Sequence, residues 1–452
     1  LNQFEPAHYF MARIFRDGES PWWNPYSASG TLALETLVDV KFSPHTLITA
    51  WLFDASPVSF DFGLLALYCM GFYFMLRIFL DIFRTSRCAA VVGAAVYLLN
   101  GFSVPNLNTG IGQPYFLFPM VLCSLLLFCQ RRDVSSWLFV VLVHAVIMLA
   151  NIMTTLMLTL LAVHALSVAF CFGLSGGARQ GAKGFPLYCL HIALAVVCAV
   201  ALLGVMWAPV VDSFFVTDMV SDFDKRMLPK PASIENLLSI FSPQHFWDVF
   251  GHIQRVDLYP NTGLEKKSPH ITYLGMVASL IAVCAWSRNK TAQRWVAGVS
   301  IALLVFAYAR VFGAMGFVDY LPVLHSIGNQ YWGCMAAVVL PVLVTLGVQN
   351  IQEEKACVSA IGVVLLLQAG AFFYLYYRLG IPSSTKQLAH VVTVMALWIL
   401  SVLWLLLAKA KRVNAKYSTA CIVLVLLAEL FSYMNTVRPM RYGVADSDPS
   451  VV

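Results

Sequence analysis

Two acidic residues near the start of the chain could act as a general base. Glu35 and Asp39 are four positions apart, so a helix that follows Gly30 would place both carboxylates on one face. An ionised carboxylate can accept the proton of an incoming hydroxyl group, while a second carboxylate orients the first or holds a metal ion. The alternative is a pair of solvent-facing acids on an amphipathic surface helix, and the spacing leaves both interpretations open.

These acids belong to a polar, aromatic-rich opening segment, residues 1–42, in which Glu5 is a third acidic candidate. Pro21 and Pro25 in this segment cannot continue a helix, because proline lacks a backbone N–H and biases the preceding residue toward an extended conformation. Between the prolines lie Trp22, Trp23 and Asn24. Tryptophan favours the membrane–water interface. We therefore expect a loop at the interface, with these three side chains available to contact a substrate.

Basic residues at the ends of apolar stretches are the natural partners of a lipid phosphate. Arg310 ends one such stretch, where an unpaired buried charge would be costly, so its side chain either reaches outward or meets an anion. Arg226, in a long polar stretch, is a weaker candidate. Glu429 lies inside the last apolar stretch; it is either functional, as intramembrane carboxylates often are, or a buried structural partner.

The composition is that of a polytopic membrane protein. Of the 452 residues, 60% are hydrophobic and 12% are charged, and the mean hydropathy is +0.75. Uninterrupted apolar runs reach the roughly 20 residues that a helix needs to cross a bilayer. The expected fold class is all-α, with about twelve spans, near residues 60–83, 88–105, 113–130, 134–150, 152–174, 186–210, 270–287, 294–312, 331–349, 356–378, 387–408 and 418–437.

Arginine and lysine gather in alternate short loops, which the positive-inside rule places in the cytoplasm. This alternation predicts two transmembrane bundles, 43–210 and 270–437, and three extracytoplasmic segments, 1–42, 211–269 and 438–452. An even number of spans with both ends outside favours a further span before Leu1, which would make about thirteen. The net charge of +6 is explained by these loops and requires no nucleic acid.

Metal and disulfide chemistry have no clear support in the sequence. The eleven cysteines lie in or beside apolar runs and lack the spacing of a zinc site or a disulfide framework, so we interpret them as small buried hydrophobic residues. Three histidines in separate spans are interpreted as hydrogen-bonded core residues. No metal ligand set is defined, although a divalent cation remains possible as a cofactor.

The opening segment resembles the first extracytoplasmic loop of YfhO-type bacterial membrane proteins. The resemblance rests on the run ESPWWNPYSASG followed by KFSP. Weaker resemblances, of order and spacing, are YLLNGFSVPNLNTGIGQPYFLFPMVL, SIFSP, YLGM, LPVLHSIGNQYWG and ELFSYMNTVRP. Together these segments extend over nearly the whole chain, although only the WNPY block is specific.

The resemblance implies a fold and an activity of the GT-C glycosyltransferase superfamily. Such an enzyme takes a sugar from a polyprenyl-phosphate donor and transfers it to an envelope glycan or lipid on the outer face of the bacterial inner membrane. The first outward loop usually carries the catalytic carboxylate, whose expected place here is at or just before Leu1. The family also places arginines in the loop before the ninth span, whereas this chain has Ile327, Gly328, Asn329 and Gln330 there.

That departure keeps two other functions open. The chain could be a non-catalytic GT-C-like scaffold or accessory subunit that works with partner membrane subunits, since the loop arginines are missing. It could also be a flippase or transporter for lipid-linked sugars. Transporters usually show internal repeats and polar residues at the bilayer midplane, whereas polar residues here gather in the outward loops, so we rank this function third.

Overall fold

The computed structural model describes the helical body of the chain and short pieces of its loops. The described residues are 17–18, 23–24, 31–32, 48–49, 51–52, 57–106, 112–150, 153–174, 181–216, 274–286, 291–311, 313–314, 318, 324, 329–355, 358–379, 385–409 and 414–436. Most of the predicted extracytoplasmic segments 1–42, 211–269 and 438–452 lie outside these residues, and the proposed domain division remains a prediction.

Helices make up nearly all of the described part. They are α4 (Pro57–Arg77) continued by the π-helix η2 (Ile78–Ile82), α5 (Arg87–Leu99), α6 (Ser103–Asn106), α7 (Gly112–Tyr115), α8 (Phe118–Arg131), α9 (Val134–Leu149), α10 (Met153–Leu174), α11 (Gly181–Val216), α13 (Met276–Val283), α14 (Thr291–Val311), α15 (Asn329–Gln352), α16 (Val358–Leu379), α17 (Thr385–Lys409) and α18 (Ala415–Thr436). Two short strands, β1 (Trp23–Asn24) and β2 (Thr31–Leu32), pair antiparallel.

Each predicted span overlaps one of these helices, and the all-α membrane fold class is confirmed. Within the described residues, five helices are long and apolar enough to cross a membrane. Between the predicted spans 134–150 and 152–174, α9 ends at Leu149 and α10 begins at Met153. Arg77 and Asp81, four positions apart, form an ion pair at 2.5 Å.

The bundle has two ends that can be told apart by their residues. Arg84, Gln130, Leu174 and Ala292 line one cavity, so the turn after η2, the ends of α8 and α10 and the start of α14 lie together; we call this the Arg84 end. Helix α14 has 21 residues and is therefore about 31 Å long. Its last turn, which contains Arg310, lies at the opposite end, the Arg310 end.

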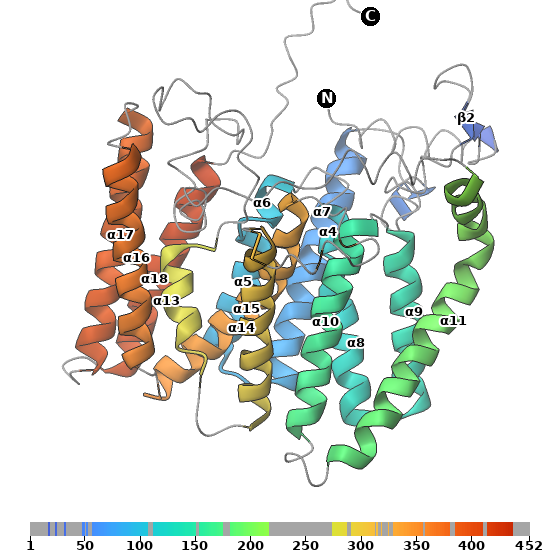
Figure 1. Ribbon diagram of the computed structural model, residues 1–452, viewed down its shortest axis with the longest axis horizontal. Coiled ribbons are helices and arrows are strands. Elements are labelled where there is room, and N and C mark those ends of the chain that lie inside the picture. Colours follow the sequence, from blue (N-terminus) through green and yellow to red (C-terminus); the bar gives the residue numbers. More distant parts are fainter. Residues whose placement is uncertain are drawn as a thin grey trace, which may run out of the picture.

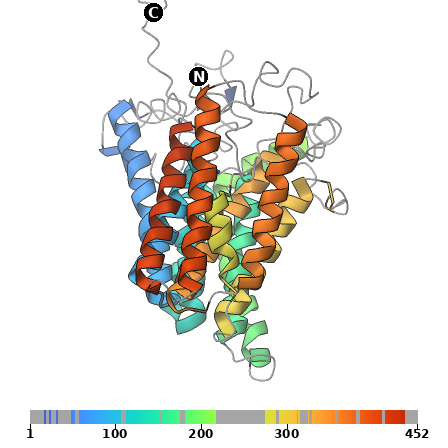
Figure 2. The ribbon, with the colours of Figure 1, turned by 90° about the vertical axis from the view of Figure 1, so that its left-hand side faces the viewer.

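Helix α15 forms the centre of the bundle. In Figure 1 it lies between α16–α18 on one side and α8–α11 on the other, and Figure 2 shows the same packed body from the side. The apolar window of α15 is 94% buried, against 28% for α11. Neighbouring backbones come very close: a Cβ atom added to Gly347 would lie 2.0 Å from the carbonyl oxygen of Ile281 in α13. Glycine therefore permits a helix contact that a larger residue would prevent.

Candidate functional site

Most of the side chains that the sequence nominates for chemistry lie outside the described residues. This is true of the acidic candidates and of part of the aromatic and basic set: Glu5, Trp22, Glu35, Asp39 and Arg226. For Trp23 and Asn24 the structure gives the backbone only, in β1, where Trp23 pairs with Leu32 and Asn24 with Thr31. The catalytic assignments therefore remain predictions, and the geometry available is that of the membrane helices.

Arg310 is the candidate that the structure places most completely. It occupies the last turn of α14 and is only 2% exposed, so the sequence alternative in which its side chain reaches into solvent is wrong. It takes part in an interaction within the chain. The turn beyond it is closed by Gly313 at φ +76° and by a 2.8 Å hydrogen bond from the Ala314 N–H to the Ala309 carbonyl.

That position favours a cation for a simple electrostatic reason. The last carbonyl groups of a helix carry partial negative charge, which stabilises arginine in the final turn. A glycine in the left-handed region is the usual way to end such a helix, because it has no Cβ to clash. The local sequence therefore holds a buried guanidinium at the Arg310 end of α14.

Helix α15 begins at the same end of the bundle. Phe306, one turn before Arg310, meets Trp332 edge to face with ring centroids 5.6 Å apart, and Trp332 is fully buried. Gln330 is the second residue of α15. The structure thus brings the helices that carry Arg310 and Gln330 together at one end. The two predicted substrate-binding positions occupy the same region of the fold.

A polar cluster supports the Arg310 end from within. The Asn100 amide nitrogen donates to the Tyr115 hydroxyl at 2.8 Å, and that hydroxyl donates to the carbonyl of Ala337 in α15 at 3.1 Å. The Asn100 side-chain oxygen accepts from the backbone N–H groups of Phe102 at 2.9 Å and Ser103 at 3.0 Å. These bonds join the end of α5 and the short helix α7 to α15.

The structure gives Glu429 a structural role, one of the two roles expected from the sequence. Its carboxylate is fully buried and accepts backbone N–H bonds from Met276 at 2.8 Å, from Val277 at 3.1 Å and from Ala278 at 3.4 Å. These are the first three amides of α13, whose N-terminal dipole favours an anion. Glu429 in α18 therefore caps α13.

Helix α13 is shorter than the predicted span 270–287. It begins at Met276, after Gly275 at φ +87°, and has eight residues, a length of about 12 Å. Asn350 of α15 holds the other end, donating to the carbonyl groups of Cys284 at 2.8 Å and Ala285 at 3.0 Å. Because both ends meet side chains of other helices, a half-length helix can exist at membrane depth.

Sequence reasoning missed how two of the histidines are arranged. His144 and His164 face each other from α9 and α10, with their Nε2 atoms 3.3 Å apart. Each Nδ1 lies 2.7 Å from the carbonyl of the residue four positions earlier, Val140 or Leu160. For these two the interpretation as hydrogen-bonded core residues is confirmed, whereas the third histidine, His191, lines a cavity beside α11 and is not a core residue. Within the described part of the chain, no third ligand joins His144 and His164 as a metal site.

Neither of the cavities described here lies near Arg310. One, of about 310 Å³, includes Arg84 and Gln130. The other, of about 500 Å³, lies between α8, α9 and α11 and includes Arg132 and Trp137. Both are therefore at the Arg84 end, away from the predicted catalytic face.

Comparison with known proteins adds one similarity. No protein-family model matches the chain, and no curated protein matches it either. Among solved structures, the chain is similar to the arabinofuranosyltransferase AftD from Mycobacteria, with 14% sequence identity and a TM-score of 0.44. The similar region covers 83% of this chain and 24% of AftD, so this chain spans about a quarter of that protein's length.

Proposed function

We propose that this chain is a GT-C-type membrane glycosyltransferase that uses a polyprenyl-phosphate sugar donor. The Arg310 end faces outward, the Arg84 end faces the cytoplasm, and the acceptor is a glycan or lipid of the bacterial cell envelope. The orientation follows from the arginine- and lysine-rich loops of the sequence. The superfamily assignment rests on the WNPY-containing segment.

The observation that carries the proposal is the burial of Arg310. A guanidinium that is 2% exposed at the end of a membrane helix is costly to maintain, and intramembrane charges of this kind often mark a substrate path. Arginine also matches the geometry of a phosphate, to which it can donate two parallel hydrogen bonds. The donor of the proposed reaction supplies such a phosphate at the membrane surface.

The proposed reaction is a single displacement at the anomeric carbon. The bond between that carbon and the donor phosphate oxygen breaks, and the electron pair leaves with the phosphate, whose charge Arg310 stabilises. The acceptor oxygen forms the new glycosidic bond, and its proton passes to a carboxylate of the opening segment, for which Glu35, Asp39 and Glu5 are the candidates. A divalent cation, if present, would share the charge of the phosphate.

A second function is favoured by one specific observation. The residues that lead into α15, from Ile327 to Gln330, contain no arginine, whereas the resemblance implies arginines at this place. A chain without them could serve as a non-catalytic scaffold for partner membrane subunits. Such a scaffold would bind no polyprenyl phosphate.

Binding and transfer by the full chain in lipid nanodiscs distinguish these functions. The binding probe is undecaprenyl phosphate, whose occupancy native mass spectrometry measures; transfer is assayed with a panel of synthetic polyprenyl-phosphate sugars. Arg310→Gln should weaken binding about 10- to 100-fold, since hydrogen bonds to a charged group contribute about 1.5–3 kcal/mol. Arg294→Gln, at the other end of α14, is the matched control and should bind as wild type does.

The acidic candidates provide the second measurement. Glu35→Gln, Asp39→Asn or Glu5→Gln should abolish transfer at the residue that acts as the base while leaving undecaprenyl phosphate bound. Wild-type protein that binds no undecaprenyl phosphate would support the scaffold. Equal binding by Arg310→Gln and Arg294→Gln would remove Arg310 from the site.

A further inference from the structure

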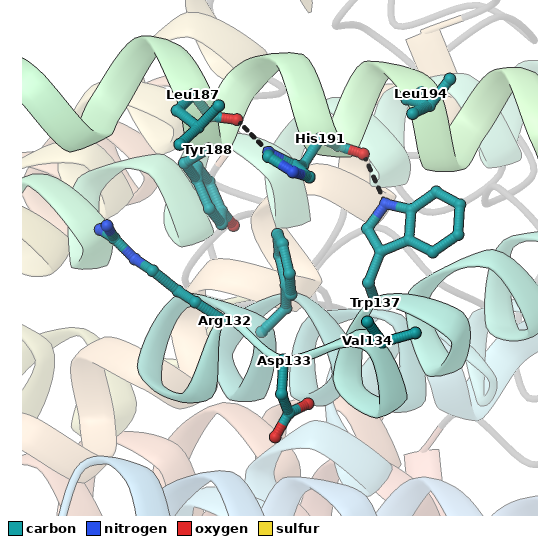
Figure 3. A pocket seen from close by; sticks show the side chains of 9 residues that line it. Arg132, Asp133, Val134, Trp137, Leu187, Tyr188, His191 and Leu194 are labelled. Atoms are coloured by element: carbon teal, nitrogen blue, oxygen red, sulfur yellow. Dashed lines mark hydrogen bonds between the residues drawn. The ribbon is translucent and has the colours of Figure 1, made fainter.

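The cavity between α8, α9 and α11 has the features of a separate lipid site. It has a volume of about 500 Å³ and lies at the Arg84 end, so it is independent of the proposed catalytic face. Figure 3 shows its lining, with Tyr188 and His191 on α11 facing Arg132 at the α8–α9 turn and Trp137 in the first turn of α9. Aromatic rings, one cation, one carboxylate and aliphatic side chains therefore meet in one place.

Arg132 has an unusual backbone for its residue type. It joins α8 to α9 at φ +55° and ψ +31°, and its N–H donates to the carbonyl of Phe128 at 3.0 Å. In this left-handed conformation a residue with a Cβ costs roughly 1–2 kcal/mol, and glycine is the usual choice. An arginine held there is a reason to look for a use of its side chain.

The neighbouring acid, Asp133, also lines the cavity, but its carboxylate is engaged at the start of α9. Asp133 caps α9, and its carboxylate accepts the backbone N–H of Ser136 at 2.7 Å. The hydrogen bonds that Ser136 provides, from its side chain and its backbone, lower the pKa of the Asp133 carboxyl group, which is thus ionised at neutral pH. Figure 3 shows this carboxylate directed away from Tyr188 and His191.

The polar groups of the cavity that can contact a ligand are the Arg132 guanidinium and one ring nitrogen of His191. The Trp137 indole N–H donates to the carbonyl of His191 at 2.9 Å. The Nδ1 atom of His191 lies 2.7 Å from the carbonyl of Leu187, so Nδ1 carries a proton. In the neutral ring, Nε2 is then a hydrogen-bond acceptor. The guanidinium of Arg132 also lies close enough to the side chain of Cys171, in α10, to donate a hydrogen bond to it.

The wall of the cavity opens sideways toward the membrane. Leu187 and Leu194, on the lining face of α11, are 54% and 50% exposed. In a membrane such side chains contact acyl chains, and tryptophan residues lie at the level of the headgroups. The cavity thus offers a cation and an acceptor beside Trp137 and an apolar path along α11.

We propose that this cavity binds one anionic glycerophospholipid from the membrane leaflet at the Arg84 end. Its phosphate pairs with Arg132, a headgroup hydroxyl donates to Nε2 of His191, and one acyl chain follows Leu187 and Leu194. Basic pockets between transmembrane helices bind anionic headgroups in this way. Phosphatidylglycerol has both the phosphate and the hydroxyl group and is the probe of choice.

The test measures phosphatidylglycerol bound to the purified full chain by native mass spectrometry, with phosphatidylethanolamine as the comparison lipid. Arg132→Gly removes the guanidinium but suits the left-handed backbone, so the variant should fold at least as well as wild type. Its affinity for phosphatidylglycerol should fall about 10-fold or more. Arg131→Gln is the matched control, because it removes the same charge one position earlier and Arg131 does not line the cavity.

A second variant tests the apolar path without changing any charge. Leu194→Trp fills the groove and should lower phosphatidylglycerol occupancy while Arg132 is intact. Equal losses from Arg132→Gly and Arg131→Gln would show general electrostatic attraction and overturn the proposal. Equal occupancy by phosphatidylethanolamine, or full binding by Leu194→Trp, would also overturn it.

Discussion

The carboxylate of Glu429 lies 2.8 Å from the backbone nitrogen of Met276, a residue 153 positions earlier in the chain. This hydrogen bond joins the last helix, α18, to the start of α13. The two residues belong to the segments ELFSYMNTVRP and YLGM, both noted for their resemblance to YfhO-type proteins. The contact gives Glu429 and Met276 a common structural role, which is the capping of α13.

Replacing Glu429 should therefore reduce stability. Glu429→Gln retains one acceptor oxygen but removes the charge and turns an amide N–H toward backbone donors, so we expect a loss of about 2–3 kcal/mol in the free energy of unfolding. The labelling rate of Cys284, which is fully buried just after α13, reports the local effect during denaturation in detergent. Glu354→Gln, at an exposed position, should unfold as wild type does.

Gly275 should tolerate no side chain beside that cap. Its φ of +87° is unfavourable for other residues, and an added Cβ would lie 2.8 Å from Glu429 Oε2. Gly275→Ala is expected to lower the free energy of unfolding by about 1–3 kcal/mol. The loss should be less than additive with Glu429→Gln, since the two residues are in contact. Gly362→Ala, where an added Cβ meets nothing within 4 Å, is the control; an equal loss there would contradict the explanation.

Two substitutions in the Asn100 cluster should reduce the free energy of unfolding by different amounts. Asn100→Ala leaves two backbone N–H groups and the Tyr115 hydroxyl with one partner fewer in a buried region, and we expect a loss of about 2–4 kcal/mol. Tyr115→Phe removes a single hydroxyl and should cost about 1 kcal/mol. Denaturant titration of both variants measures the order, and a larger loss from Tyr115→Phe would refute the assignment of Asn100 as the centre of the cluster.

The cap at Asp133 predicts a pH dependence of definite sign. Its pKa is lowered in the folded protein, so its contribution to stability is present above the ordinary aspartate value of about 3.9 and is lost as the pH falls through the folded value. Asp133→Asn keeps a capping side chain that does not titrate in this range. The stability advantage of wild type over Asp133→Asn should be constant near neutral pH and disappear in acid. An advantage that grew as the pH fell would show that the carboxylate is not the stabilising group.

Much of the membrane body could be predicted from the sequence, because a long apolar run has few alternatives to a helix in a bilayer. The start and end of α9 and α10 agree with the prediction to within a few residues. Helix α13 does not, since its limits are set by Glu429 and Asn350, which come from helices later in the chain. Apolar periodicity contains no information about such distant caps.

In the candidate site, too, the local sequence predicted residues but not their contacts with distant parts of the chain. Arg310 was predicted from its place at the end of an apolar run, but a choice between exposure and burial required the packing of α14 against α15. Asn100 and Tyr115 lay in a segment chosen for its resemblance, yet nothing local indicated that they would bond to Ala337, more than 220 positions further on. The roles of Glu35 and Asp39 remain predictions.

The short length of α13 bears on how the protein is made. A helix of about 12 Å cannot cross a hydrocarbon core of about 30 Å, and its first amides meet their acceptor only when Glu429 has been synthesised. During translation, the first backbone N–H groups of α13 therefore lack their carboxylate acceptor until α18 enters the membrane. A chain that stops before α18 would leave those amides without the Glu429 acceptor. Helix α18 thus completes the assembly.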